Sequence, residues 1–145
     1  MTALTLSAAD EIATVTLRKG REFNAHPLTV VVLDAGGHMK VVKREDGSGI
    51  ARVEIAHGKA WGALGMGISS RGLSVRAGKV PNFFTALASV TDGRMVPVPG
   101  GVLIKDADGE IIGAAGVSGD TSDIDETCVV AGIEAAGLTP DIEER

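Results

Sequence analysis

The chain has 145 residues, a net charge of −5 and 44% apolar residues. This length suits one domain with a substantial core, so we expect a single domain over residues 1–145. The acidic charge argues against nucleic acid or an anionic membrane surface as a partner, and no apolar run reaches the roughly 20 residues that span a bilayer. The single cysteine, Cys128, and the lack of a signal-peptide pattern lead us to expect a cytoplasmic protein.

The first third of the chain predicts a helix followed by a β-hairpin. Ser7 with Asp10 forms a capping box, so the first helix is expected to run from there to about Asn24. Residues 28–33 form an uninterrupted apolar run rich in valine, which predicts a strand buried on both faces. A turn at residues 34–37 then leads to a return strand over residues 38–44.

A second helix is predicted over residues 50–66, with two distinct faces. Its apolar positions share one side, which we expect to cover the sheet. Gly58, Gly62 and Gly65 lie together on another side, although each glycine costs a helix about 1 kcal/mol relative to alanine. We therefore expect this glycine face to meet a neighbouring helix or subunit at close range.

The remaining elements are a loop, a short helix, a second hairpin and a last helix. Residues 68–79 are polar and contain glycines, which predicts a loop, and Pro81 then begins a short helix to about Val90. Residues 102–104 and 111–117 flank an Asp-Gly turn and predict the hairpin. Ser122 caps the last helix, which ends before Thr139-Pro140. The order indicates the α+β class, with helices on a mostly antiparallel sheet.

Two side chains of the second helix are candidates for chemistry. Lys59 can neutralise a ligand carboxylate or act as a base if burial lowers its pKa, or it can be a solvated lysine paired with Glu54. His57 lies on the apolar face, where a core histidine, a haem ligand and a general base are all open alternatives. Residues 116–119 feed the last helix, whose first turn favours a bound carboxylate or phosphate.

The acidic residues and histidines limit the other classes of site. Asp34, Glu45, Asp46 and Asp125 either cap turns and a helix or converge as an acid–base set or an oxygen-ligated cation site. No two histidines have the spacing of a zinc site, and no haem-attachment motif is present, so neither a zinc site nor covalently attached haem is encoded locally, and we assign no residue to a metal site. Ser118 lacks the motif of a hydrolase nucleophile.

Four segments together resemble the GlcG/HbpS-like family, which also includes OrfY-like proteins and the C-terminal domain of PduO-type proteins. They are residues 28–47, residues 53–63, the double glycine at 100–101 and residues 108–132. The resemblance implies a profilin-like α/β/α fold with a five-stranded antiparallel sheet. It also implies homo-oligomers built from dimers, commonly octamers, and proteins that bind haem or are implicated in its degradation.

The resemblance carries a set of site residues onto this chain, with a pocket where the hairpins meet the second helix, often at a subunit boundary. One position departs from the family pattern, because Glu45 stands where an apolar residue is usual and would disfavour an anionic propionate. The residues carried over by their motif positions are Asp34, Arg44, Asp46, Glu54, Lys59, Gly100, Gly101, Ser118, Gly119 and Asp125.

Two functional hypotheses remain open, beside a third in which the protein is an oligomeric accessory component. In the first, the protein binds a small molecule, with haem or a related tetrapyrrole as the leading ligand and no other cofactor. In the second, it is a cofactor-independent enzyme that acts on a small carboxylated or hydroxylated catabolic intermediate. Its catalytic residues would be Lys59, His57, Asp34 and Asp46, and the ligand would be held by Arg44, Glu54, Gly100, Gly101, Ser118, Gly119 and Asp125.

Overall fold

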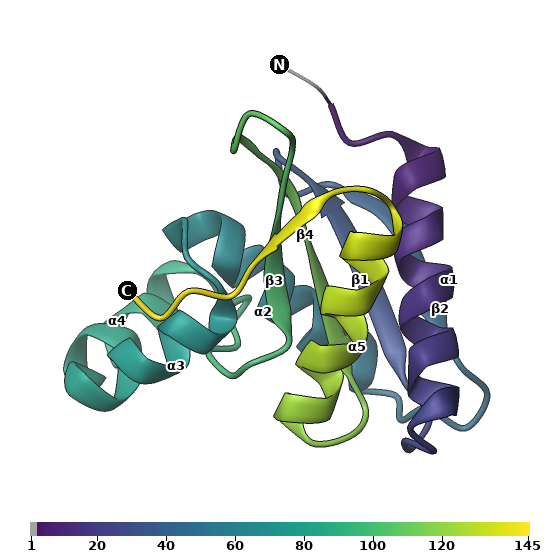
Figure 1. Ribbon diagram of the computed structural model, residues 1–145. Helices are drawn as coiled ribbons and strands as arrows, with labels where there is room; N and C mark the ends of the chain where they lie inside the picture. Colours follow the sequence, from purple (N-terminus) through teal and green to yellow (C-terminus); the bar gives the residue numbers. More distant parts are fainter. Residues whose placement is uncertain (1–2) are drawn as a thin grey trace.

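A computed structural model describes residues 3–145 and contains a five-stranded sheet with helices on both faces (Figure 1). The helices are α1 (Leu6–Glu22), α2 (Arg52–Met66), α3 (Ser70–Lys79), α4 (Pro81–Val90) and α5 (Ser122–Ala135). The strands are β1 (Thr29–Asp34), β2 (Met39–Arg44), β3 (Gly101–Lys105), β4 (Ile111–Ser118) and β5 (Thr139–Asp141). No helix in the part of the chain that the structure describes combines the length and apolarity needed to cross a bilayer.

The sheet has the strand order β2-β1-β4-β3-β5, and every neighbouring pair is antiparallel. Both predicted hairpins are present, and β1 pairs with β4 to join them. In the second hairpin Gly109 has a φ of +80°, as the Asp-Gly turn predicts. These elements confirm the α+β class and the five-stranded antiparallel sheet of a profilin-like α/β/α fold.

Side chains that alternate along the strands form two core layers. Val30 and Val32 of β1 pack under α1 and α5, whereas Val31 and Leu33 pack under α2. Figure 1 shows α1 and α5 side by side on one face, with α2 behind the sheet. Strand β1 is therefore buried on both faces, as its continuous apolar run predicts.

Helix α2 approaches the sheet closely because small residues face each other there. Ala56 and Ala60 are fully buried in the layer between helix and sheet. A β-carbon on Gly116 of β4 would lie only 2.0 Å from the carbonyl oxygen of Ala56, and one on Gly101 of β3 would lie 2.2 Å from that of Lys59. Glycine at these strand positions lets the helix backbone rest directly on the sheet.

Gly58 and Gly62 of the glycine face of α2 meet a segment of their own chain, which corrects at these two positions the expectation of a neighbouring helix or subunit. A β-carbon on Gly58 would lie 2.6 Å from the side chain of Val96, and one on Gly62 would lie 2.4 Å from that of Met95. The backbone N–H of Val96 also donates to the carbonyl oxygen of Gly58 at 3.1 Å. The glycines therefore seat an extended segment that precedes β3.

Residues 70–79, predicted as part of a loop, form helix α3. Ser69 caps the helix by accepting a hydrogen bond from the N–H of Gly72, and Leu73 is fully buried. Leu73 packs with Ile68, Phe84 and Met95 in a separate small core cluster between α3 and α4. This tertiary packing compensates for a glycine-containing, polar sequence with weak helix propensity.

Two helix starts and one strand also differ from the sequence-based expectations. Thr5, rather than Ser7, caps α1 by accepting from the N–H of Ala8, and Thr121, rather than Ser122, caps α5. The Thr139-Pro140 pair does not merely end the last helix but begins β5, which pairs with β3. Proline is tolerated there because β5 is an edge strand.

Candidate functional site

The predicted site residues Lys59 and Asp125 form a buried ion pair between α2 and the first turn of α5. The Lys59 ammonium donates to the Val117 carbonyl oxygen at 2.8 Å and to Oδ2 of Asp125 at 3.2 Å. Lys59 is only 2% exposed and Asp125 only 1%. Burial lowers the pKa of Lys59 and raises the pKa of Asp125, and the attraction between the two charges opposes both shifts. The pair is enclosed by the chain itself.

The double glycine accommodates the side chain of Lys59. Gly100 has a φ of +124°, and a β-carbon there would lie 2.9 Å from Nζ of Lys59. Gly101 donates its N–H to Oγ of Ser70 at 2.7 Å, and its own carbonyl oxygen accepts from the same hydroxyl at 3.2 Å. The structure therefore brings Gly100 and Gly101 together with Lys59 and Asp125, but as packing partners inside the fold.

The Ser118–Gly119 turn also lies at this buried group. The Ser118 hydroxyl is fully buried and accepts a hydrogen bond from Nη1 of Arg52 at 3.1 Å. A β-carbon on Gly119 would lie 2.3 Å from the carbonyl oxygen of Pro27. At the start of α5, Oδ1 of Asp125 accepts from the N–H of Asp120. The Asp125 carboxylate thus accepts a backbone N–H at the start of α5, where the sequence suggested that a bound anion would accept it.

A different surface brings together two other predicted residues, His57 and Glu54. They project from neighbouring turns of α2 into a hollow of about 390 Å³, which we call the α2 hollow. Its lining residues are Met39, Val53, Glu54, His57, Asp92, Gly93 and Arg94. It therefore combines the second helix, the first residue of β2 and the segment before β3.

The imidazole of His57 faces the α2 hollow, and its charged form is disfavoured there. Burial lowers the pKa of His57, the Arg94 cation lowers it further, and Glu54 acts in the opposite direction. Within residues 3–145 the His57 ring makes no hydrogen bond to the protein, whereas Nδ1 of His38 lies 3.1 Å from Oδ1 of Asp34 in a separate turn. A neutral imidazole without a protein partner is available to a ligand.

Sequence reasoning missed Arg94 and Trp61, which adjoin His57. The guanidinium carbon of Arg94 lies 4.2 Å from the centroid of the Trp61 ring. Trp61 follows His57 by one helical turn, so its proximity could be read from the helix period. Arg94 could not, because its position depends on how the segment before β3 docks on the glycine face of α2.

The acidic residues of the predicted set do not converge. Oδ1 of Asp34 accepts from the backbone N–H groups of Gly36 and His38 and lies 3.1 Å from the His38 ring, in its own turn. Asp46 lies in a separate hollow of about 410 Å³, which is lined by Arg21, Pro27, Arg44, Glu45 and Asp46. In the described part of the chain, no cluster of three or more acidic, histidine or cysteine residues is arranged to hold a metal ion.

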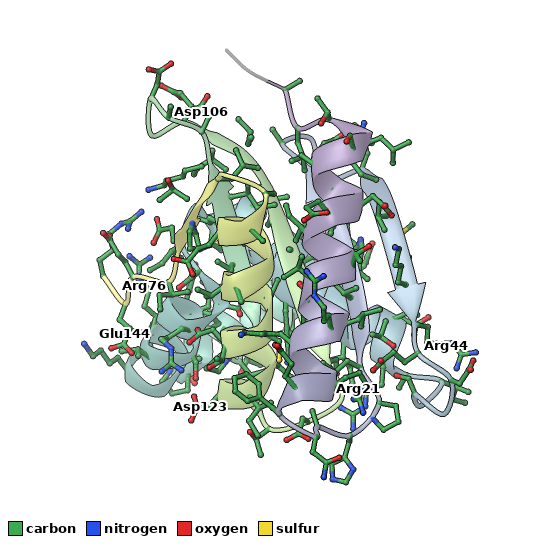
Figure 2. All side chains as sticks on the ribbon, turned by 45° about the vertical axis from the view of Figure 1, so that its right-hand side comes forward. Arg21, Arg44, Arg76, Asp106, Asp123 and Glu144 are labelled. Carbon is green, nitrogen blue, oxygen red and sulfur yellow. The ribbon has the colours of Figure 1, made fainter. Side chains whose placement is uncertain are left out.

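The hollow around Arg44 is lined mainly by charged side chains, some of which bind groups of the chain itself. Arg21 pairs with Glu45 at 3.1 Å, and Nη1 of Arg44 donates to the Ser48 carbonyl oxygen at 2.8 Å. Figure 2 shows Arg21 and Arg44 at one end of the molecule, away from the hairpin turn that carries Asp106. Glu45, the departure from the family pattern, also accepts from the N–H of Leu28 at 2.8 Å, so it fixes the start of β1.

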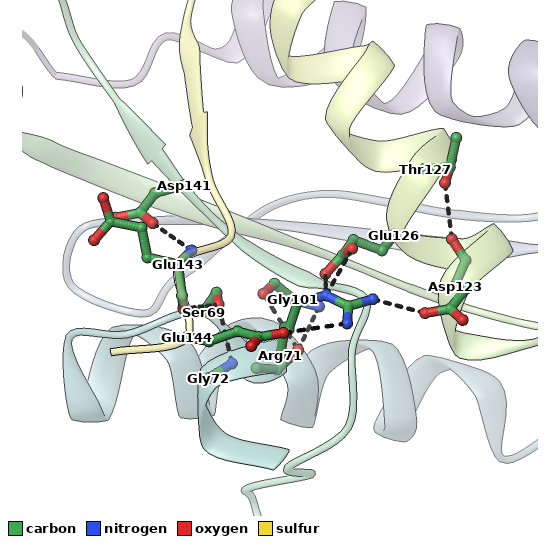
Figure 3. A network of polar contacts seen from close by, with 11 residues as sticks. Ser69, Arg71, Gly72, Gly101, Asp123, Glu126, Thr127, Asp141, Glu143 and Glu144 are labelled. Carbon is green, nitrogen blue, oxygen red and sulfur yellow. Dashed lines mark hydrogen bonds and ion pairs between the residues drawn. The ribbon is translucent and has the colours of Figure 1, made fainter. Parts of the chain in front are cut away.

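A network around Arg71 holds α3 against the rest of the fold (Figure 3). Nε of Arg71 donates to both carboxylate oxygens of Glu126 at 3.0 Å, Nη2 pairs with Asp123 at 2.6 Å, and Nη1 lies 3.5 Å from Glu144. These carboxylates raise the pKa of Arg71. The network joins α3 to α5 and to the residues after β5, and it supports the fold rather than a ligand site.

Comparison with known proteins places this geometry in a family. A family model described as "Haem degrading protein HbpS-like" matches residues 4–134. A search of curated proteins gave no significant match. The OrfY structure of Klebsiella pneumoniae shares the fold, with a TM-score of 0.84, 24% identity, and coverage of 94% of this chain and 93% of that one.

Two further solved structures are similar over nearly their whole length. A PduOC:haem complex has a TM-score of 0.86 and 25% identity, with 97% of this chain and 99% of that chain covered. A structure of HbpS has a TM-score of 0.80 and 28% identity, with 92% and 90% covered. The family match over residues 4–134 and these two structures agree, and the chain belongs to the HbpS-like family of haem degrading proteins.

Proposed function

We propose that this protein binds haem in the α2 hollow, with the imidazole of His57 as the ligand of the iron. The family description and the haem complex of a similar structure support haem as the ligand class. The observation that carries the proposal is the position of His57. Its ring faces a hollow with apolar Met39 and Val53 on the wall and has no hydrogen-bond partner within residues 3–145.

The residues present fit a flat, largely apolar ligand that carries acid groups. The α2 hollow accommodates part of such a ring, and the adjoining face of β2 extends it. Helix α2 does not cover Met39 and Val42 on that face, which are 61% and 40% exposed. His57 would hold the iron, Met39 and Val53 would contact the ring, and Arg94 offers a positive charge. Bound haem would supply an iron centre for ligand exchange or redox chemistry.

We also propose that the protein acts as a homo-oligomer built from dimers. Helix α4 has no charged residue, and Phe83 and Val90 are 52% and 77% exposed. Large exposed apolar side chains on one helix are typical of a protein interface. The double substitution Phe83→Lys/Val90→Lys should reduce the mass measured by sedimentation, whereas Thr85→Lys on another side of the helix should not.

The acid–base hypothesis receives less support from the geometry. Lys59 and Asp125 are enclosed, and Asp34 and Asp46 lie in separate hollows. Of its four proposed catalytic residues, only His57 lines the α2 hollow. We therefore retain small-molecule binding by a single domain of a cytoplasmic protein as the proposed function.

Titration of the purified protein with ferric haem tests the proposal. The wild-type protein should give a saturable shift of the Soret band, and His57→Ala should abolish this shift or move it to a different wavelength. His26→Ala is the matched control, because its side chain is exposed and outside the α2 hollow. A spectrum unchanged in His57→Ala, or no shift in the wild type, would refute the proposal.

A further inference from the structure

We propose that Arg94 binds a carboxylate of the ligand and thereby sets the orientation of that ligand in the α2 hollow. This inference rests on the proposed function, because it concerns the acid groups of the haem that His57 would hold. Arg94 lies outside the motifs that carry the family resemblance. Its role follows from how the fold holds its guanidinium group beside His57 and the apolar wall.

Two contacts fix the guanidinium group and leave its terminal amino groups available. Nε of Arg94 donates to the Thr91 carbonyl oxygen at 2.9 Å, and the guanidinium carbon lies 4.2 Å from the centroid of the Trp61 ring. Within residues 3–145, no acceptor is bonded to Nη1 or Nη2, and no carboxylate forms an ion pair with them. A planar group held in this way suits the two oxygens of a carboxylate.

The two residues that follow Arg94 anchor its segment to helix α2. The N–H of Val96 donates to the Gly58 carbonyl oxygen, and the Met95 side chain packs against Gly62. Met95 is also buried in the cluster between α3 and α4. Arg94 is thus positioned by its neighbours before a ligand arrives, which reduces the entropy lost on binding.

The other charges of the α2 hollow give Arg94 a directing role. Glu54 and Asp92 line the same hollow, so a ligand carboxylate placed beside either of them would be repelled. Met39 and Val53 provide the apolar wall. A ring with acid groups therefore lies with its carboxylate at Arg94 and its apolar body towards Met39 and Val53.

Two ligands that differ only in their acid groups separate this role from a structural one. Ferric haem and its dimethyl ester, in which both carboxylates are esterified, are titrated into wild type, Arg94→Gln and Arg94→Lys. We expect Arg94→Gln to bind haem about tenfold more weakly than wild type, the size expected for one hydrogen bond to a charged group. Arg94→Lys should retain part of the affinity, and the dimethyl ester should bind wild type and Arg94→Gln equally.

Arg18→Gln is the control, because Arg18 is exposed on α1, on the opposite face of the sheet. Unchanged haem affinity in Arg94→Gln, or an equal loss for haem and its ester, would overturn the role of Arg94 while His57-dependent binding upholds the proposed function. Absence of His57-dependent haem binding in the wild type would overturn both. Circular dichroism of each variant identifies any loss that comes from misfolding.

Discussion

The ammonium group of Lys59 lies 3.2 Å from Oδ2 of Asp125, and both side chains are almost completely buried. The pair connects α2 on one face of the sheet with the first turn of α5 on the other. Gly100 makes room for the lysine where it passes the start of β3. Residues that read as a ligand site in the sequence therefore hold the two helical layers together.

Removal of the Lys59 charge should destabilise the fold strongly. In Lys59→Met, the Asp125 carboxylate loses its cation inside the protein, and we expect the free energy of unfolding to fall by about 3–5 kcal/mol. Urea unfolding followed by circular dichroism measures this loss. Lys79→Met, at an exposed position in α3, should change the free energy by less than about 0.5 kcal/mol. A loss in Lys59→Met as small as that of the control would contradict this role.

A methyl group at Gly116 should disturb the contact between α2 and the sheet. The β-carbon of Gly116→Ala would lie 2.0 Å from the Ala56 carbonyl oxygen, a backbone atom that cannot rotate away. We expect a loss of about 3 kcal/mol in the free energy of unfolding. Gly78→Ala is the matched control, because its β-carbon meets no atom within 4 Å and alanine favours a helix by about 1 kcal/mol. Equal stability of the two variants would show that α2 does not rest on the strand backbone.

Haem affinity should depend on pH through His57. The pKa of His57 lies below its usual 6.5, so the imidazole is neutral and able to bind iron at pH 7 and above. As the pH falls through the lowered pKa, protons compete with the iron and the affinity should fall. Titrations from pH 5 to pH 8 test this, with Glu54→Gln as a second variant. Because Glu54 raises the pKa of His57, its removal should move the loss of affinity to lower pH. A shift to higher pH would contradict the assignment.

The sequence predicted those elements whose signals are local. The two hairpins follow from apolar runs beside turn residues, such as Asp108-Gly109. Three helices follow from capping residues and apolar periodicity, and the short helix follows from Pro81 at its start. The prediction of a loop over residues 68–79 was wrong. Helix α3 forms there because it is stabilised by the distant partners of Arg71 and by the buried Leu73. Strand β5 was missed because it has only three residues, one of them a proline, and it depends on its pairing with β3.

The site was only partly predictable for a related reason. His57 and Glu54 share one side of a helix, so their shared hollow is consistent with the helix period. The depth at which Lys59 is buried depends on the glycines at 100 and 101, whose close approach to α2 no local pattern describes. Arg94 depends on the docking of Val96 against Gly58, a contact between distant parts of the chain.

Replacement of the His57 imidazole by free imidazole tests the central claim most directly. His57→Gly removes the ring and leaves space in the α2 hollow, so ferric haem should no longer give the wild-type Soret band. Added imidazole should restore that band in His57→Gly and should leave the spectrum of His26→Gly unchanged. A wild-type spectrum in His57→Gly without imidazole, or no recovery when imidazole is added, would contradict the account.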